Sequence, residues 1–502
     1  MITPGRHQEQ VVEKFIGVPW RLIGDSMGTG KTLSGVLLDL AERRESEDGH
    51  FRTLIICTKG GLDVWRWHLE DQGVPNDRIM VIDPGNRDAF SDELDRGAVN
   101  YDYYIMHYNA LDLIPFFGKV QIGRNALVWD HIIVDEAQYI KNRKSKRTMT
   151  LKRQKARFRT LCSGTPADDK PQDIWSLLNF GDKKKYSSYW RFVDEYVSYT
   201  EEWNHKLDHG YRKLGAPKNV GKFHQEIYNH YIRRTLPEVR GSMPPKTHSK
   251  LWVDLTERQM RDYRDIEEFQ LARIGEQEEE YLIFWQVVVQ QRLQQMTIGT
   301  AIELDWSYYE SFWERWKDAD PDDIPDGAPS GPKIVLGEPS PKVDVAMEKI
   351  EEAFDEGESV VVMSCYRDLV KMVESRCRKS KIPVSVLHGG MTSQAKRNAA
   401  VADFQSRKTR VFVGTIAAAG TSITLTAART LLFTDRHWNP SVNRQAEDRI
   451  WRYDTQDPVQ IIDILARNTL DDDKLDKIWE KGRRVDAMVE IPEKFKKMGV
   501  LL

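Results

Sequence analysis

The chain has 502 residues, of which 40% are hydrophobic and 30% are charged, and its formal net charge is −3 at pH 7. This length exceeds the usual size of one domain, so we expect two or three hydrophobic cores. The near-neutral charge excludes a strong overall positive field, so any contact with nucleic acid must be local. The sequence shows no signal-peptide pattern and no membrane-length apolar run, and its four cysteines lack metal-ligand spacing. We therefore expect a soluble intracellular protein with reduced thiols.

A glycine-rich segment early in the chain has the features of a phosphate-binding loop. Residues 24–32 read Gly-Asp-Ser-Met-Gly-Thr-Gly-Lys-Thr and lie between an apolar run and a helical segment, the order that such loops require. Backbone N–H groups would face the phosphates, Lys31 would neutralise the β- and γ-phosphates, and the Thr32 hydroxyl would ligate Mg²⁺. Asp25 stands where the strict pattern has glycine, so a plain turn before an ordinary helix is the alternative.

About a hundred residues later, an apolar strand ends in two adjacent acids, Asp135 and Glu136. Hydrolysis of a phosphoanhydride needs one acid to hold Mg²⁺ and another to orient or deprotonate water. An Asp-Glu pair is also a common start signal of a helix, but its combination with the glycine-rich loop favours the catalytic interpretation. A further strand ends at Ser163 and Thr165, whose hydroxyls could sense the γ-phosphate.

Short β-rich runs alternate with helix-length segments in both halves of the chain, which predicts two parallel sheets with crossover helices. The runs are 53–58, 103–106, 360–363, 384–387, 411–413, 431–434 and 461–464. In the second half, a helix carrying Gln445, Arg449 and Arg452 would place both arginines one turn apart on one face. Two guanidinium groups so placed suit a γ-phosphate, and salt bridges to Glu447 and Asp448 are the alternative.

Lys or Arg occupies nine of the positions from Lys141 to Arg157, and no acid interrupts them. The segment follows the paired acids closely in the sequence. The segment could contact a nucleic-acid backbone, or it could be a solvated basic face. Its position beside the proposed catalytic edge favours the first interpretation.

Together these motifs resemble the Swi/Snf-like branch of the superfamily-two helicases, and the resemblance covers nearly the whole chain in the family's order. Further matching positions are Gln8, 232–235, 243–246, 388–391, 415–425 and 438–449 with Arg452. The amino-acid pattern from Gln445 to Arg449 resembles that of the annealing and fork-remodelling members. The departures, at Ser26, Thr29, Gln138, Ser422 and 453–455, leave the lysine and both acids in place.

The resemblance implies an α/β fold with two tandem RecA-like lobes, each a doubly wound parallel sheet, with a helical inter-lobe insertion and a C-terminal brace helix. The implied domains are lobe 1 with the ATP site (1–182), the helical insertion and acidic linker (183–341), lobe 2 of the helicase C-terminal type (342–468), and the brace helix with its tail (469–502).

The insertion is expected to contain a long helix and a linker. Thr256 is placed to cap a charged helix that runs to about residue 298. Aromatic residues between 306 and 316 recur at helical spacing, which favours internal packing over a base-stacking platform. Residues 318–341 are rich in Asp, Pro and Gly and indicate an acidic, flexible linker.

The resemblance also assigns roles by position. The implied catalytic residues are Lys31, Asp135, Glu136, Gln445, Arg449 and Arg452. The implied ATP-binding residues are Gln8, Gly28, Thr29, Gly30, Lys31 and Thr32, with Thr32 and Asp135 as the Mg²⁺ ligands. Ser163, Thr165 and Gly420 would couple hydrolysis to movement. The implied DNA contacts are Lys59, Lys141, Arg143, Thr415 and Trp438.

The activity that follows is ATP- and Mg²⁺-dependent translocation on double-stranded or branched DNA without obligatory strand separation. Because the contacts are mostly to phosphate, we expect weak sequence preference and strong salt dependence. Two alternatives stay open: a strand-separating or RNA-directed helicase of the same superfamily, and an ATP-switched DNA-binding or recruiting clamp. We expect a monomeric motor, cytoplasmic and nucleoid-associated in a bacterial or virus-infected cell, or nuclear in a eukaryotic one.

Overall fold

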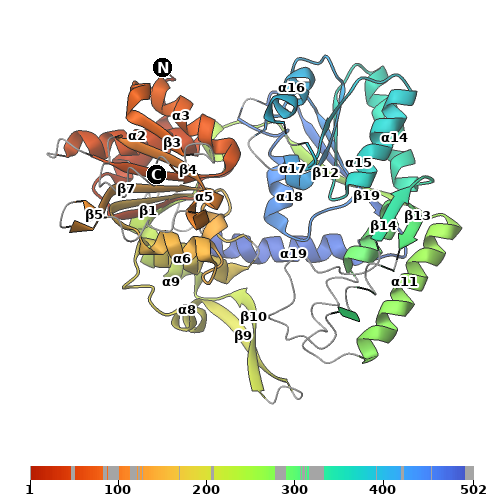
Figure 1. Ribbon diagram of the computed structural model, residues 1–502, viewed down its shortest axis with the longest axis horizontal. Coiled ribbons are helices and arrows are strands. Elements are labelled where there is room, and N and C mark those ends of the chain that lie inside the picture. The colour runs from red at the N-terminus through yellow and green to blue at the C-terminus, as the bar shows by residue number, and fades with distance from the viewer. Residues whose placement is uncertain are drawn as a thin grey trace. The chain divides into compact units, whose positions relative to one another are not determined.

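The computed structural model of the chain contains two compact units, each described separately below (Figure 1). Unit 1 comprises Met1–Glu202, Tyr211–Met243 and Glu480–Leu502, and unit 2 comprises Trp203–Gly210 and Pro244–Trp479. The structure describes residues 2–46, 51–82, 88, 101–113, 121–122, 125–126, 128–168, 170–204, 209–276, 290–305, 307, 311, 314–315, 333–391, 393–419, 423–453 and 455–491.

Unit 1 contains a seven-stranded parallel sheet in the order β11-β1-β8-β7-β2-β4-β3. Its strands are β1 (Trp20–Ile23), β2 (Thr53–Cys57), β3 (Ile79–Ile82), β4 (Tyr103–His107), β7 (Val128–Asp135), β8 (Lys155–Cys162) and β11 (Tyr231–Ile232). The register pairs Cys162 with both Ile23 and Asp135. The loops that follow β1, β7 and β8 therefore leave the sheet at the same edge, where ligands of parallel sheets collect.

Hydrophobic side chains cover both faces of this sheet. Along β7, Ile132 and Val134 belong to one core and Ile133 belongs to the other, because successive residues of a strand point to opposite faces. The helices are α1 (Arg6–Phe15), α2 (Lys31–Glu45), α3 (Leu62–Asp71), α5 (Tyr108–Leu113), α6 (Lys146–Arg153), α7 (Ile174–Gly181), α8 (Tyr189–Tyr196), α9 (Val220–Ile227) and α10 (Leu236–Arg240). Two strand pairs follow: β5 (Gln121–Ile122) with β6 (Asn125–Ala126), and β9 (Val197–Asn204) with β10 (His209–Pro217), of which Trp203–Gly210 are counted with unit 2.

Unit 2 contains a second parallel sheet of six strands in the order β12-β19-β18-β15-β17-β16. They are β12 (Lys246–Val253), β15 (Val360–Ser364), β16 (Val384–Leu387), β17 (Val411–Thr415), β18 (Thr430–Phe433) and β19 (Val459–Ala466). The other elements are α11 (Glu257–Glu276), α14 (Pro341–Asp355), α15 (Arg367–Lys379), α16 (Gln394–Gln405), α17 (Ile416–Ala419), α18 (Pro440–Glu447), and the antiparallel pair of β13 (Thr300–Asp305) and β14 (Lys333–Gly337). Along β15, Val362 and Val361 again belong to different cores. Two doubly covered parallel sheets confirm the predicted fold class.

The last helix, α19 (Asp471–Val489), begins among residues of unit 2 and ends among residues of unit 1. Its final turns supply Val485, Met488 and Val489 to the unit 1 core, and Ile491 joins them. The C-terminal helix therefore packs on the first sheet's core, as the resemblance implies.

The segment between the sheets agrees in part with its sequence pattern. The Thr256 hydroxyl accepts a hydrogen bond from the Gln259 N–H at 3.2 Å and so caps α11. Residues 290–298 are again helical. Most of the aromatic stretch 306–316 and the first part of the predicted linker lie outside the described residues, and β14 lies within the linker's range. None of the described helices has the length and apolar character of a membrane span.

Candidate active site

The glycine-rich loop joins β1 to α2 and depends on two glycines with left-handed backbone. Gly28 has φ +77° and Gly30 has φ +79°, a conformation that a side chain would strain. Gly30 also lies against Gln8: a Cβ on it would sit 2.6 Å from the Gln8 amide nitrogen, which donates to the Gly30 carbonyl at 3.2 Å. The Thr29 hydroxyl donates to the Ser26 carbonyl at 2.8 Å.

The Lys31 ammonium is held by the backbone of this loop. Its Nζ donates to the carbonyls of Asp25 and Ser26 at 2.9 and 3.0 Å, and burial lowers its pKa. Two of its three N–H groups are thereby satisfied, and among the residues that the structure describes the third is left for an anion. Thr32 follows in the first turn of α2, where backbone N–H groups favour a phosphate.

Asp25, the residue that departs from the glycine pattern, anchors the loop to a distant segment. Its side chain is 1% exposed and accepts hydrogen bonds from the Arg234 backbone N–H at 2.9 Å and from the Arg234 guanidinium. Arg234 belongs to the matching stretch 232–235, but no local pattern indicates that it pairs with a residue 209 positions away.

The paired acids occupy the turn at the end of β7. Trp65 Nε1–H donates to Asp135 Oδ2 at 2.9 Å, and burial together with the charge of Glu136 raises the pKa of Asp135 to about 6. Glu136 has φ +48°, a rare conformation for a residue with a side chain. The Tyr108 hydroxyl donates to the carbonyls of both acids and holds this turn. Sequence patterns gave no signal for Trp65.

A chain of hydrogen bonds links Glu136 to the predicted sensing hydroxyls. Gln138 Nε2 donates to Glu136 Oε2 at 2.8 Å, and the Ser163 hydroxyl donates to Gln138 Oε1 at 2.6 Å. The Thr165 N–H donates to the Ser163 oxygen at 3.1 Å. The Thr165 hydroxyl is buried and has no hydrogen-bond partner within the described part of the chain, which marks it as a group able to meet a ligand.

These segments converge on one place in unit 1. A Cβ on Gly164 would lie 2.8 Å from the Met27 side chain and 3.4 Å from Lys31 Nζ, so the turn after β8 touches the glycine-rich loop. The left-handed glycines, the lysine, the acids after β7 and the unpartnered hydroxyl are the donor set that a magnesium nucleotide requires. The residues present therefore fit ATP and Mg²⁺.

The predicted arginines lie together in unit 2, although not on a helix as the sequence pattern predicted. That prediction was wrong because α18 ends at Glu447, and the Arg449 carbonyl instead accepts a hydrogen bond from the Leu425 N–H at 2.8 Å. The Arg449 guanidinium donates to the Ile423 carbonyl at 3.4 Å. Arg452 donates to the hydroxyl of the adjacent Thr424.

Gln445 lies within α18, two residues before its end. Glu447, one of the two acids in the salt-bridge alternative, is instead bound by Arg436 at 2.6 Å and Lys246 at 3.1 Å. The charges of Arg449 and Arg452 act on Asp448, the other acid. The salt-bridge alternative therefore does not account for Arg449 through Glu447.

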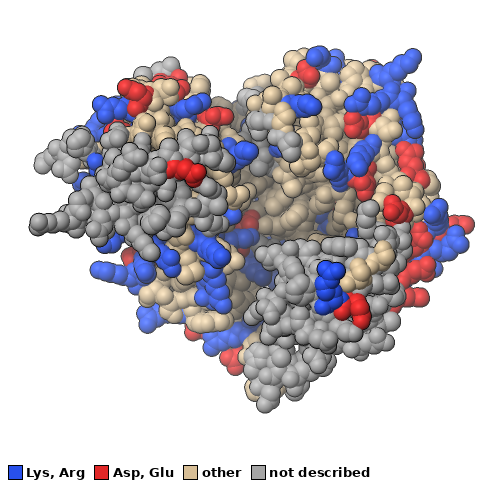
Figure 2. Space-filling view, in the orientation of Figure 1, with Lys and Arg blue, Asp and Glu red and all other residues tan. Residues whose placement is uncertain are grey.

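The predicted DNA contacts divide between the two units. Lys59 is exposed after β2, Lys141 forms an ion pair with Asp168, and the Arg143 guanidinium lies 4.4 Å from the centre of the Tyr189 ring. Figure 2 shows Lys and Arg side chains gathered over the region where Figure 1 labels α6.

In unit 2, Thr415 is the last residue of β17, and Trp438 follows β18. Trp438 borders a cavity of about 280 Å³ that Arg292, Tyr366 and His437 also line. The coupling residue Gly420 lies outside the described residues.

The comparisons with known proteins agree with this geometry. The family model described as SNF2-related domain matches residues 7–298, which is more than half of the chain. The chain belongs to the SNF2-related family. A second model, the helicase conserved C-terminal domain, matches residues 342–454. The two models together cover every strand of both sheets of this SNF2-related chain except β19.

Curated relatives resemble this SNF2-related chain along most of its length. The ISWI chromatin-remodeling complex ATPase ISW1 of Saccharomyces cerevisiae is 24% identical over 480 residues, which are 93% of this chain and 38% of that protein. The human SWI/SNF-related matrix-associated actin-dependent regulator of chromatin subfamily A member 1 is 25% identical over 484 residues, 93% of this chain and 41% of that protein. The chain thus spans about two fifths of the length of these relatives.

A solved structure, the Sulfolobus solfataricus SWI2/SNF2 ATPase core in complex with dsDNA, is 21% identical. The comparison covers 98% of each chain with a TM-score of 0.39.

Proposed function

We propose that this chain is an ATP-driven translocase on double-stranded or branched DNA that remodels DNA or protein–DNA complexes without obligatory strand separation. One observation carries the proposal: Lys31, Asp135, Glu136 and Thr165 come together at one edge of a parallel sheet in a member of the SNF2-related family. The relatives' names, which include a chromatin-remodeling ATPase, support DNA as the track.

Each residue of unit 1 has a defined task in this proposal. Lys31 would bind the β- and γ-phosphates, and Thr32 and Asp135 would hold Mg²⁺, which supplies positive charge to the phosphate oxygens. Glu136 would orient the attacking water, with its carboxylate fixed by Gln138. Ser163 is hydrogen-bonded to Gln138 and belongs to the turn that contacts the glycine-rich loop. Loss of the γ-phosphate would therefore change the position of this turn through Ser163.

Unit 2 would contribute positive charge at the moment of reaction. Arg449 and Arg452 are anchored to the neighbouring residues Ile423 and Thr424, so one loop positions both guanidinium groups. Planar guanidinium groups suit the charge that develops on the transferred phosphoryl group. Repeated closing and opening of the two units during the ATP cycle would move the phosphate contacts along one DNA strand.

The test compares ATP hydrolysis by the full chain with duplex DNA, single-stranded DNA and RNA, together with displacement of a triplex strand from duplex DNA. We expect duplex DNA to stimulate hydrolysis most and the triplex strand to be displaced only with ATP. Greater stimulation by RNA or single-stranded DNA, with strand separation, would favour the helicase alternative. Duplex-dependent ATP binding without displacement would favour the clamp.

A further inference from the structure

We propose that Glu490 and Arg233 position the glycine-rich loop, and that α19 thereby links this loop to the Trp438 region of unit 2. The inference rests on the proposed nucleotide function of the loop. It gives Arg233 and Glu490 a positioning role, because neither is placed to touch the nucleotide's reacting atoms in the site described above.

The buried Arg233 side chain bonds to the end of α19, to the glycine-rich loop and to the turn after β8. Its Nε and Nη2 donate to Glu490 Oε1 at 3.0 and 2.7 Å. Its Nη1 donates to the carbonyl of Gly24, which opens the glycine-rich loop, and to the carbonyl of Gly164 at 2.8 Å. Arg233 is only 8% exposed, so its bonds to the two carbonyls are shielded from water, while the Glu490 side chain is 34% exposed. One guanidinium therefore fixes three segments at once.

A second contact ties the same helix end to the same loop. The Tyr231 hydroxyl donates to the Val489 carbonyl at 2.8 Å. The Tyr231 ring lies so close to Gly24 that a Cβ there would sit 2.5 Å from it. Tyr231 and Arg233 therefore both join the first residue of the loop to the last residues of α19, and a shift of this helix end would move the loop.

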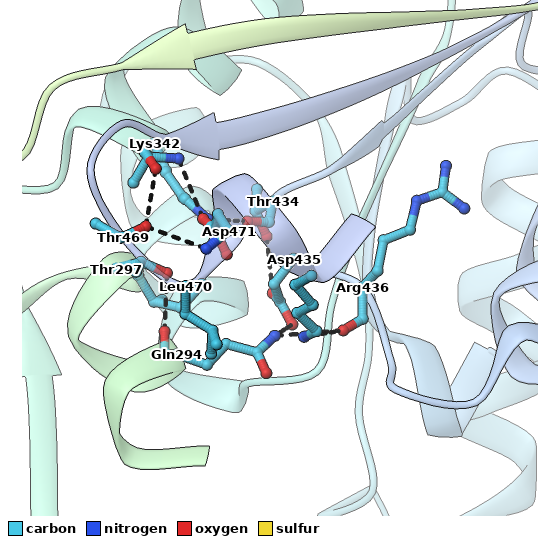
Figure 3. Close-up of polar contacts among 12 residues, drawn as sticks. Gln294, Thr297, Lys342, Thr434, Asp435, Arg436, Thr469, Leu470 and Asp471 are labelled. Carbon is cyan, nitrogen blue, oxygen red and sulfur yellow. Dashed lines mark hydrogen bonds and ion pairs between the residues drawn. The ribbon is translucent and has the colours of Figure 1, made fainter. Parts of the chain in front are cut away.

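The start of α19 is fixed in unit 2 by buried charges (Figure 3). Lys342 is fully buried, and its Nζ donates to Asp471 Oδ2 and to the Thr434 carbonyl, each at 2.6 Å. Lys474, one turn later, donates to the Arg436 carbonyl. Both carbonyls belong to the segment that leads from β18 to Trp438.

Gln294 reinforces this segment from the other side, since its amide nitrogen lies 3.3 Å from both Asp435 Oδ2 and the Arg436 carbonyl. One helix thus begins at the segment that carries a proposed DNA contact and ends at the residue that holds the phosphate loop. A change in the Trp438 segment when DNA binds would be passed along α19 to Arg233.

The test measures the affinity of the full chain for a fluorescent ADP analogue, and KM and kcat for ATP with and without duplex DNA. Glu490→Gln keeps the side chain's shape but removes its charge. We expect it to weaken ADP binding and raise KM on the order of fivefold to tenfold, with a smaller change in kcat. Glu480→Gln is the matched control, because Glu480 lies on the same helix in an exposed pair with Arg484, and it should leave both constants unchanged.

Two further variants keep the proposal falsifiable. Glu490→Asp keeps the negative charge on a side chain that is one methylene shorter, so it should give an ADP affinity between those of the natural chain and Glu490→Gln. It replaces Glu490→Gln in the test if that variant does not fold. Asp471→Asn, at the other end of α19, should also weaken ADP binding and reduce the stimulation of kcat by DNA. Folded Glu490 variants with the affinity of the natural chain would overturn the positioning role, and an unchanged Asp471→Asn would overturn the link through α19. If the natural chain itself bound no ATP, the proposed function would fall instead.

Discussion

At the scale of single residues, Glu136 has the clearest catalytic consequence. Its left-handed backbone and its hydrogen bond from Gln138 hold the carboxylate in one place. Glu136→Gln should lower kcat by about 10²- to 10⁴-fold, because a positioned base contributes that much, and should leave ADP affinity within about twofold. Steady-state ATPase and nucleotide titration measure the two effects. Glu9→Gln, on the exposed side of α1, is the control, and a Glu136→Gln variant with normal turnover would contradict the assigned role.

A second prediction concerns His131, which is fully buried in unit 1 away from the acids of the site. Its Nδ1–H faces Asp39 Oδ1 at 2.6 Å, its Nε2 lies 2.7 Å from the Thr160 hydroxyl, and the Arg21 guanidinium lies close by. Burial, followed by the nearby Arg21 charge, outweighs Asp39 and lowers the pKa of His131 to about 4. The neutral imidazole is therefore the form that the fold requires.

The sign of the pH dependence follows from this lowered pKa. Between pH 6.5 and about 4 the unfolded chain binds a proton at His131 that the folded chain excludes, so stability falls as the pH falls through this window, by about 3 kcal/mol in total. Although burial opposes it, the hydrogen bond with His131 lowers the pKa of Asp39 below its ordinary value of 3.8, so the stability that Asp39 contributes is present throughout this window and is lost only at lower pH. Calorimetric melting from pH 7 to 4 should show a smaller loss for His131→Gln, and identical slopes would contradict the argument.

Sequence patterns located the candidate catalytic and phosphate-binding residues of the site, but not the residues that position them. Lys31, Asp135 and Glu136 follow from loop, strand and helix signals that lie within a few positions of each residue. Arg234 and Arg233 could not be assigned their roles, because their partners Asp25 and Glu490 are 209 and 257 positions away. Such pairings depend on how the sheet brings distant segments together, which no local periodicity encodes.

At the scale of elements, the basic stretch around α6 should make the affinity for DNA depend on salt concentration. Lys144 and Lys146 are exposed at the start of this helix. If both contact phosphates, the double substitution Lys144→Ala/Lys146→Ala should lower the slope of log affinity against log salt by about 2. The control, Lys371→Ala/Lys379→Ala on α15, removes the same charge from another exposed face. DNA titrations at several salt concentrations measure the slope, and equal slopes for both pairs would exclude α6 as a contact.

Strands were predicted better than helix ends. The runs 53–58, 411–413 and 461–464 became β2, β17 and β19, because a short continuous apolar run is typical of a strand buried on both faces and is visible locally. The end of α18 was not predictable, since it depends on Leu425 donating to the Arg449 carbonyl from another loop. The β9–β10 hairpin was also missed, because its strands carry charged residues that pair across it, such as Lys213 with Glu202.

At the scale of the whole molecule, hydrolysis should need residues from both sheets. Arg452→Ala should lower DNA-stimulated kcat by about 10³-fold or more, the effect expected for an arginine that neutralises transition-state charge. ADP affinity should change little, because the glycine-rich loop and Lys31 remain intact. Arg378→Ala on α15 removes an exposed arginine and serves as the control. An Arg452→Ala variant that hydrolyses ATP normally would remove unit 2 from the catalytic step.

The two-sheet architecture was predictable from the sequence. The return of the C-terminal segment to the core of the first sheet was not. Alternating strands and helices indicate a parallel sheet wherever they occur. They do not show that Val485, Met488 and Ile491 complete the core of the first sheet, whose strands end at Ile232.

This return of the C-terminal segment bears on how the protein is made. A ribosome releases the amino-terminal segments first, yet the first core lacks several of its apolar side chains until Ile491 has emerged. By then the chain of the second sheet, which ends at Ala466, is already complete. We therefore expect a nascent polypeptide to gain any ability to hydrolyse ATP only after the second sheet has been synthesised, so that the first unit alone does not hydrolyse ATP during translation.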